Sequence, residues 1–122
     1  MPNRICMIIR RAPYGTIHAA EAVRHINGAL SNGLETVVIL VEDGVHLAKK
    51  NQRADAVGWT SLSNTIVQAI KGKNGHLLKL YLHDESARSR GLTPAMIIEG
   101  FSMASEEEIA RMVPEAPSTM IF

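Results

Sequence analysis

Two continuous apolar runs decide the fold: Ile5-Cys6-Met7-Ile8-Ile9 and Thr36-Val37-Val38-Ile39-Leu40-Val41. Neither run alternates with polar residues, which is typical of strands covered on both faces, as in a parallel sheet. Between them, apolar residues recur at three- and four-residue steps. They predict an amphipathic helix from Ile17 to Ser31, with Thr16 as its N-cap. A strand, a helix and a second strand within about 40 residues predict a βαβ unit with a right-handed crossover.

The rest of the chain continues this alternation. We expect a helix capped by Thr60 or Ser61 that runs to Ile70, and a helix that starts at Ser105 followed by three glutamates. The further strands are expected at Leu77–Leu82, Met96–Ile98 and Met120–Phe122. The sequence thus predicts a three-layer α/β sandwich with a mostly parallel sheet of about five strands.

Composition restricts the class of protein. The chain has 122 residues, 46% hydrophobic and 20% charged, so we expect a single globular domain over residues 1–122. Thirteen Lys and Arg against twelve Asp and Glu leave a net charge of +1, so no charge excess calls for nucleic acid or an anionic membrane. No apolar run approaches the roughly 20 residues that span a bilayer, and no leader pattern opens the sequence. We therefore expect a cytoplasmic protein.

Ligands of open parallel sheets bind beyond the carboxyl ends of the strands. Three segments lie there, Arg10–Thr16, Glu42–His46 and His83–Ser86, and His83 is the best-placed titratable side chain. Helix-start amides near Arg10 could hold an anion, and a carboxylate beside an imidazole could orient it or join it on a metal. The expected ligand pocket comprises Tyr14, Gly15, Thr16, Asp43, His46 and His83.

Structural roles compete with each of these assignments. Thr16 can simply cap a helix, Asp43 can simply form a turn before a glycine, and Ser86 can cap a short helix through Arg90. His18, Glu21 and His25 share one helix face that could collect a metal, yet a solvated polar face is expected there anyway. Cys6 falls within a buried strand, where a thiol is usually inert. We therefore assign no catalytic residue, no metal ligand and no cofactor.

The order of several short motifs resembles the DsrE/DsrF-like family, which includes sulfur-relay subunits of the TusC and TusD type. A Pro-x-Gly-Thr turn follows the first strand, and an Asp-Gly-Val follows the second. Later features that look like the family are Arg90-Gly91, Gly100-Phe101 and a closing apolar strand. The matching residues are Pro13, Gly15, Thr16, Asp43, Gly44, Val45, Arg90, Gly91, Gly100, Phe101 and Phe122.

The resemblance implies a Rossmann-like fold, assembly into trimers or hexamers, at times with related subunits, and, for some members, sulfur carried as a persulfide. It places the carrier cysteine just after the third strand, where this chain has His83. Because imidazole cannot form a persulfide, we expect a non-catalytic, oligomeric or partner-binding relative of the sulfur-relay subunits. The alternative is a small-ligand or metal-binding protein that uses a pocket around His83, His46 and Asp43.

Overall fold

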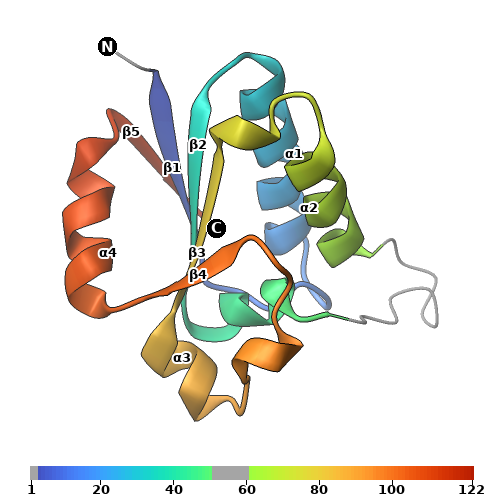
Figure 1. Ribbon diagram of the computed structural model, residues 1–122, viewed down its shortest axis with the longest axis vertical. Coiled ribbons are helices and arrows are strands. Elements are labelled where there is room, and N and C mark those ends of the chain that lie inside the picture. Colours follow the sequence, from blue (N-terminus) through green and yellow to red (C-terminus); the bar gives the residue numbers. More distant parts are fainter. Residues whose placement is uncertain (1–2, 51–60) are drawn as a thin grey trace.

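The computed structural model describes residues 3–50 and 61–122, and its strands form one parallel sheet in the order β4-β3-β2-β1-β5 (Figure 1). The strands are β1 (Arg4–Ile9), β2 (Glu35–Leu40), β3 (Leu78–His83), β4 (Phe101–Ala104) and β5 (Ser118–Ile121). The α-helices are α1 (His18–Ser31), α2 (Leu62–Lys71), α3 (Asp84–Ser89) and α4 (Glu106–Met112). Short 3-10 helices include η1 (Glu42–Ala48) and η4 (Pro94–Met96).

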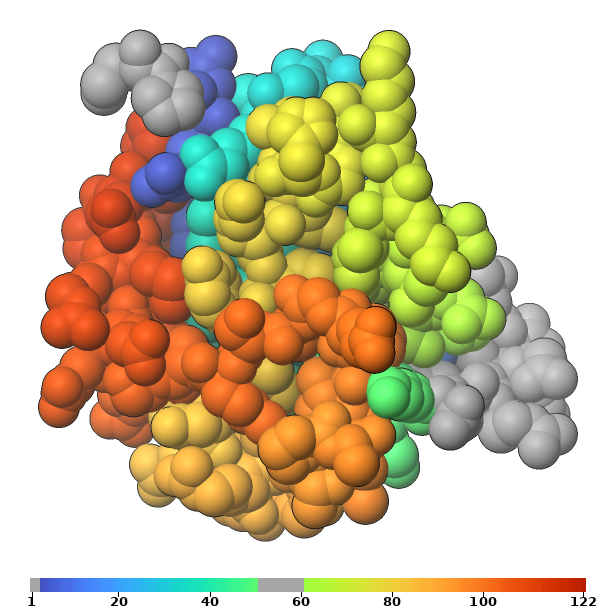
Figure 2. Space-filling view, in the orientation of Figure 1, coloured from blue at the N-terminus to red at the C-terminus, as the bar shows by residue number. Residues whose placement is uncertain are grey.

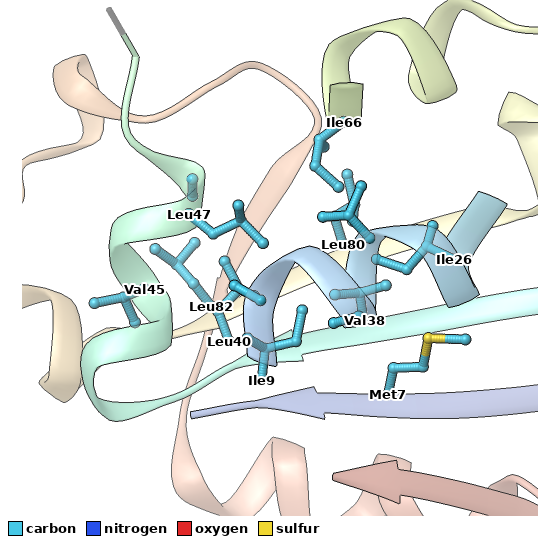
Figure 3. Close-up of a cluster of buried hydrophobic side chains, with 14 of the residues drawn as sticks. Met7, Ile9, Ile26, Val38, Leu40, Val45, Leu47, Ile66, Leu80 and Leu82 are labelled. Carbon is cyan, nitrogen blue, oxygen red and sulfur yellow. The ribbon is translucent and has the colours of Figure 1, made fainter. Parts of the chain in front are cut away.

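Helices cover both faces of the sheet, so the predicted three-layer α/β architecture is confirmed (Figure 1). On one face, Met7, Ile9, Val38 and Leu40 pack with Ile26 of α1 and Ile66 of α2 (Figure 3). On the other face, Cys6, Val37 and Ile39 pack against Ile109 and Met112 of α4. The central strands are apolar without alternation because each of their faces meets a helix.

Three local predictions about helix and strand boundaries are wrong. Residues Met96–Ile98 do not form the fourth strand, because Pro94–Met96 is a 3-10 turn and Ile97 makes one antiparallel bridge with Lys49. Thr16 is not a cap, since α1 begins at His18 with Ile17 as an N-cap that has no side-chain hydrogen bond. The short helix α3 starts two residues before Ser86.

Other boundary predictions are confirmed. Ser61 accepts a hydrogen bond from Asn64 N–H and caps α2, whereas Thr60 lies outside the described residues. Ser105 caps α4 in a reciprocal capping box with Glu108. These polar N-caps satisfy amide groups that the first helical turn leaves without partners.

Gly44 brings η1 against the end of β1. Its amide donates to the carbonyls of Arg10 and Val41, and a Cβ built on it would lie 2.0 Å from the Ile9 carbonyl oxygen. No side chain fits in that space, so the Asp-Gly-Val motif needs glycine at its centre. This close approach positions Asp43 and Glu42 at the carboxyl edge of the sheet.

Candidate functional site

His83 ends β3 and is held in place by a buried serine. Its Nδ1 lies 2.7 Å from Ser86 Oγ, and the amide of Glu42 donates to the same oxygen at 3.0 Å. Ser86 is buried, and the His83 side chain is only 12% exposed. A hydroxyl can accept two hydrogen bonds or accept one and donate one, so it satisfies both neighbours. The imidazole ring is therefore oriented by Ser86 of α3, whose hydroxyl is itself held by the Glu42 amide of η1.

The other ring nitrogen has no hydrogen-bond partner. Among the described residues, His83 Nε2 is buried and makes no hydrogen bond, and the nearest carboxylate oxygen recorded is Glu106 Oε1 at 3.6 Å. Glu106 is the first residue of α4, so the C-terminal helix closes this side of the site. In Figure 2, α3 and α4 lie beside each other at the lower left of the molecule. A cavity of about 360 Å³ is lined here by Val41, Glu42, His83, Ser86, Glu106, Ile109 and Ala110.

His83 is also the centre of a group of metal-type ligands. His83, Glu85 and Glu106 each place one ligand atom within 4.8 Å of the others. Glu85 and Glu106 are exposed, and among the described residues neither carboxylate has an ion pair with an arginine or lysine. These three side chains come from β3, α3 and α4.

A second cavity, of about 390 Å³, lies beyond the ends of β1 and β2. It is lined by Arg10, Arg11, Ala12, Tyr14, Thr16, Glu42 and Asp43. The Tyr14 hydroxyl accepts a hydrogen bond from Leu62 N–H at 3.2 Å, which ties this loop to α2. Gly15, between Tyr14 and Thr16, has φ +97°, a conformation that favours glycine.

The structure divides four of the six expected pocket residues between these two cavities, and Gly15 lines neither of them. Tyr14, Thr16 and Asp43 line the cavity beside Arg10, and His83 lines the cavity beside α4. His46 is half-buried in η1 and lines neither of the two. Glu42 borders both cavities and has φ +51°.

Sequence reasoning assigned no site role to Glu42, Glu85, Ser86 or Glu106. Glu42 is marked by its backbone conformation, a feature that residue type does not reveal. The sequence favours helix-start positions for Glu85 and Glu106. Both do lie in the first turns of α3 and α4. Their proximity depends on the β3–β4 pairing, in which His83 is level with Ala104.

The order Ser86, His83, Glu106 is that of a nucleophile, a base and an orienting acid. Ser86 is buried, however, and its oxygen already accepts the Glu42 amide hydrogen. Because it is buried, its hydroxyl is not exposed to a substrate. Cys6 is fully buried in β1, and burial raises the pKa of its thiol. Among the described residues, no nucleophilic serine or thiol is thus exposed at this site.

Two of the sequence motifs meet in space. The carboxylate of Asp43 accepts a hydrogen bond from Arg90 Nε at 2.9 Å, which links η1 to the end of α3. The Gly91 that follows has φ +72° and ends the helix. The Asp-Gly-Val and Arg-Gly motifs are therefore joined by one ion pair at the carboxyl edge of the sheet.

The histidine face of α1 has local partners. Glu21 pairs with Arg24, and this hydrogen bond lowers the pKa of the Glu21 carboxyl. His25 Nδ1 lies 2.7 Å from the Glu21 carbonyl oxygen, and its ring packs against Phe122 at 5.4 Å between centroids.

Within the described ranges, no helix has both the length and the apolar character needed to cross a bilayer.

Comparison with known proteins places these features in a family. The chain is 32% identical over 118 residues to an uncharacterized protein of Methanopyrus kandleri, covering 97% of this chain and 93% of that one. An uncharacterized protein of Methanocaldococcus jannaschii is 29% identical over 98% of this chain and 99% of its own. The intracellular sulfur oxidation protein DsrF of Allochromatium vinosum is 28% identical over 92% of this chain and 82% of its own.

Solved structures agree on the fold. The ychN protein of E. coli superposes with a TM-score of 0.85 at 16% identity, covering 98% of this chain and 99% of that one. A protein of unknown function from Methanobacterium thermoautotrophicum gives a TM-score of 0.72 at 12% identity, with the same coverage. The family model described as DsrE/DsrF-like matches residues 3–122. The chain therefore belongs to the DsrE/DsrF-like family and is related to sulfur-relay proteins.

Proposed function

We propose that this protein is a non-catalytic, partner-binding subunit of an oligomeric, cytoplasmic sulfur-relay assembly. One observation carries the proposal: the single cysteine of the sequence lies fully buried inside β1, while His83 ends β3. A persulfide forms on an accessible thiolate, and its sulfur must reach a second thiol. A buried Cys6 with a raised pKa does not meet either condition.

Exposed apolar groups support association with other subunits. Met103 of the edge strand β4 and Ile121 of the edge strand β5 are both large exposed hydrophobic residues. Beside β4, a cavity of about 340 Å³ is lined by Leu82, Pro94, Ile97, Ile98, Glu99, Gly100, Phe101 and Met103. Edge strands with unpaired backbone groups and nearby apolar side chains favour pairing with another chain.

The absence of sulfur transfer is tested by loading the folded protein with cysteine persulfide and weighing it by intact mass spectrometry. We expect the wild type to gain no sulfur. His83→Cys places a thiol at the position that the family resemblance assigns to the carrier, and we expect this variant to gain one sulfur atom. His83→Cys combined with Cys6→Ser identifies the loaded residue. Stoichiometric sulfur on the folded wild type would overturn the proposal.

Association is tested separately by native mass spectrometry of the purified chain. We expect a trimer or a hexamer, alone or after co-expression with related cysteine-bearing subunits. A monomer under both conditions would contradict the partner-binding role.

The Arg10 cavity favours a second candidate function, the binding of a small anionic ligand. It is lined by the carboxylates of Glu42 and Asp43 but by neither His46 nor His83, and Asp43 is already engaged by Arg90. The positive charge of this cavity comes from Arg10 and Arg11. We expect inorganic phosphate to raise the melting temperature of the wild type and not of Arg10→Gln. The control is Arg24→Gln, on the exposed face of α1, and equal shifts in all three proteins would exclude the site.

A further inference from the structure

His83 Nε2 is a buried nitrogen that lies near the Glu106 carboxylate without a hydrogen bond to it. At 3.6 Å, the separation from Glu106 Oε1 is too long for an N–H···O hydrogen bond. Two ligands of one tetrahedral zinc ion, with bonds of about 2.0–2.2 Å, lie about 3.4 Å apart. The spacing therefore fits two ligands that share an ion better than a direct contact.

Glu85 completes a set of three ligand groups. Its carboxylate lies within 4.8 Å of both His83 and Glu106, so the ligand atoms of two carboxylates and one imidazole are gathered in one place. The neighbouring cations are engaged elsewhere, because Arg88 pairs with Asp84 and Arg90 pairs with Asp43. Like-charged carboxylates at this separation are stabilised by a cation between them.

The surroundings keep the ligands available. Histidines that bind metals usually have their second ring nitrogen hydrogen-bonded, and here Nδ1 meets Ser86 Oγ, which is itself held by the Glu42 amide. The tautomer that donates from Nδ1 to this oxygen leaves a lone pair on Nε2. Glu106 is not needed to cap α4, because Ser105 and Glu108 form the capping box. Its side chain is 77% exposed and can adjust to an ion.

We propose that His83, Glu85 and Glu106 bind one divalent transition-metal ion, and that Zn²⁺ is the ion to which this nitrogen-and-carboxylate set is suited. Three protein ligands leave a fourth position open. His83 and Glu106 both line the cavity that also includes Val41, Ile109 and Ala110, so water or a group of another molecule can reach an ion held by these two side chains. The inference does not depend on the proposed subunit role.

The test is calorimetric titration of the chelator-treated 122-residue chain with zinc chloride. We expect one Zn²⁺ per subunit for the wild type, and an association constant lowered at least about tenfold by Glu106→Gln and by Glu85→Gln. Glu107→Gln is the matched control, since Glu107 is exposed on the same helical turn but lies outside the group. Circular dichroism checks that each variant is folded.

Several outcomes would overturn the site. These are no stoichiometric binding by the wild type, wild-type affinity in Glu106→Gln, or an equal loss in Glu107→Gln. Loss of binding in His46→Gln with full binding in His83→Gln would place the ion elsewhere. X-ray absorption of the zinc-loaded wild type supplies an independent readout: we expect one imidazole with oxygen ligands, and a sulfur ligand would contradict the assignment.

Discussion

Cys6 shows how burial changes the chemistry of a single residue. The side chain is 0% exposed between α4 and the sheet, and burial raises the pKa of its thiol. The reactive form is the thiolate. The raised pKa lowers its population, and burial keeps reagents away from the sulfur. We expect the folded protein to react with a thiol reagent only as fast as it unfolds, and the denatured protein to react at once. Rapid reaction of the folded chain would contradict this burial.

The same pKa shift predicts a dependence of stability on pH. The folded thiol holds its proton to a higher pH than the unfolded thiol, whose ordinary pKa is about 8.5. Its contribution to the free energy of unfolding is therefore full below that pH and decreases as pH rises above it. Denaturant titrations of wild type and Cys6→Ala isolate this slope, and parallel profiles would show that the thiol does not contribute.

Ser86 connects three segments through one hydroxyl. Ser86→Ala leaves the Glu42 amide without the acceptor of its part-buried hydrogen bond and releases the His83 ring. We expect the free energy of unfolding to fall by about 1–3 kcal/mol. Ser89→Ala is the control, because Ser89 is exposed and accepts no buried amide, and its effect should be within about 0.5 kcal/mol. Equal effects of the two changes, measured by urea unfolding, would count against this role.

At the scale of elements, the packing of η1 on β1 rests on Gly44. A methyl group there meets the Ile9 carbonyl oxygen at 2.0 Å, so η1 must move. We expect Gly44→Ala to lower the free energy of unfolding by about 1–3 kcal/mol or more. Gly28→Ala, in the middle of α1 where an added Cβ meets no atom within 4 Å, should raise it by about 0.5–1 kcal/mol. We expect the two variants to shift the melting temperature in opposite directions. A Gly44→Ala variant as stable as the wild type would refute the close approach.

The misplaced fourth strand shows why an apolar run does not identify an element. Ile97 and Ile98 are buried as their hydrophobicity indicates, but they lie in the connection between α3 and β4. Pro94 turns the chain before them, and Gly100, with φ +112°, turns it again before β4. The actual strand, Phe101–Ala104, is an edge strand with exposed Ser102 and Met103, so its sequence carries a weak signal.

At the scale of the whole molecule, the strand order predicts a gradient of local stability. β2 is paired on both sides and nearly all buried, whereas β4 is paired only with β3. We expect amides of β2 to exchange with solvent only through global unfolding, and those of β4 to exchange through smaller openings. Hydrogen exchange followed by mass spectrometry measures this difference. Equal protection of both strands would contradict it.

Local periodicity was sufficient for the α/β class. The unbroken apolar runs around Met7 and Val38, the stripe on α1 and the polar caps Ser61 and Ser105 each specify an element through contacts within a few residues. The three carboxyl-edge segments were also correctly located as a neighbourhood, because parallel strands all end on one edge.

Only the tertiary structure decided which side chains meet at that edge. His83 and Glu106 are 23 positions apart and Glu42 and Ser86 are 44 apart, yet each pair is in contact or near it. Their distances follow from strand register, from the close approach at Gly44 and from the crossover that brings α4 to the opposite face. Residue type determines what a side chain can bind. Long-range packing determines which side chains meet, because the number of residues between two positions does not fix their distance in space.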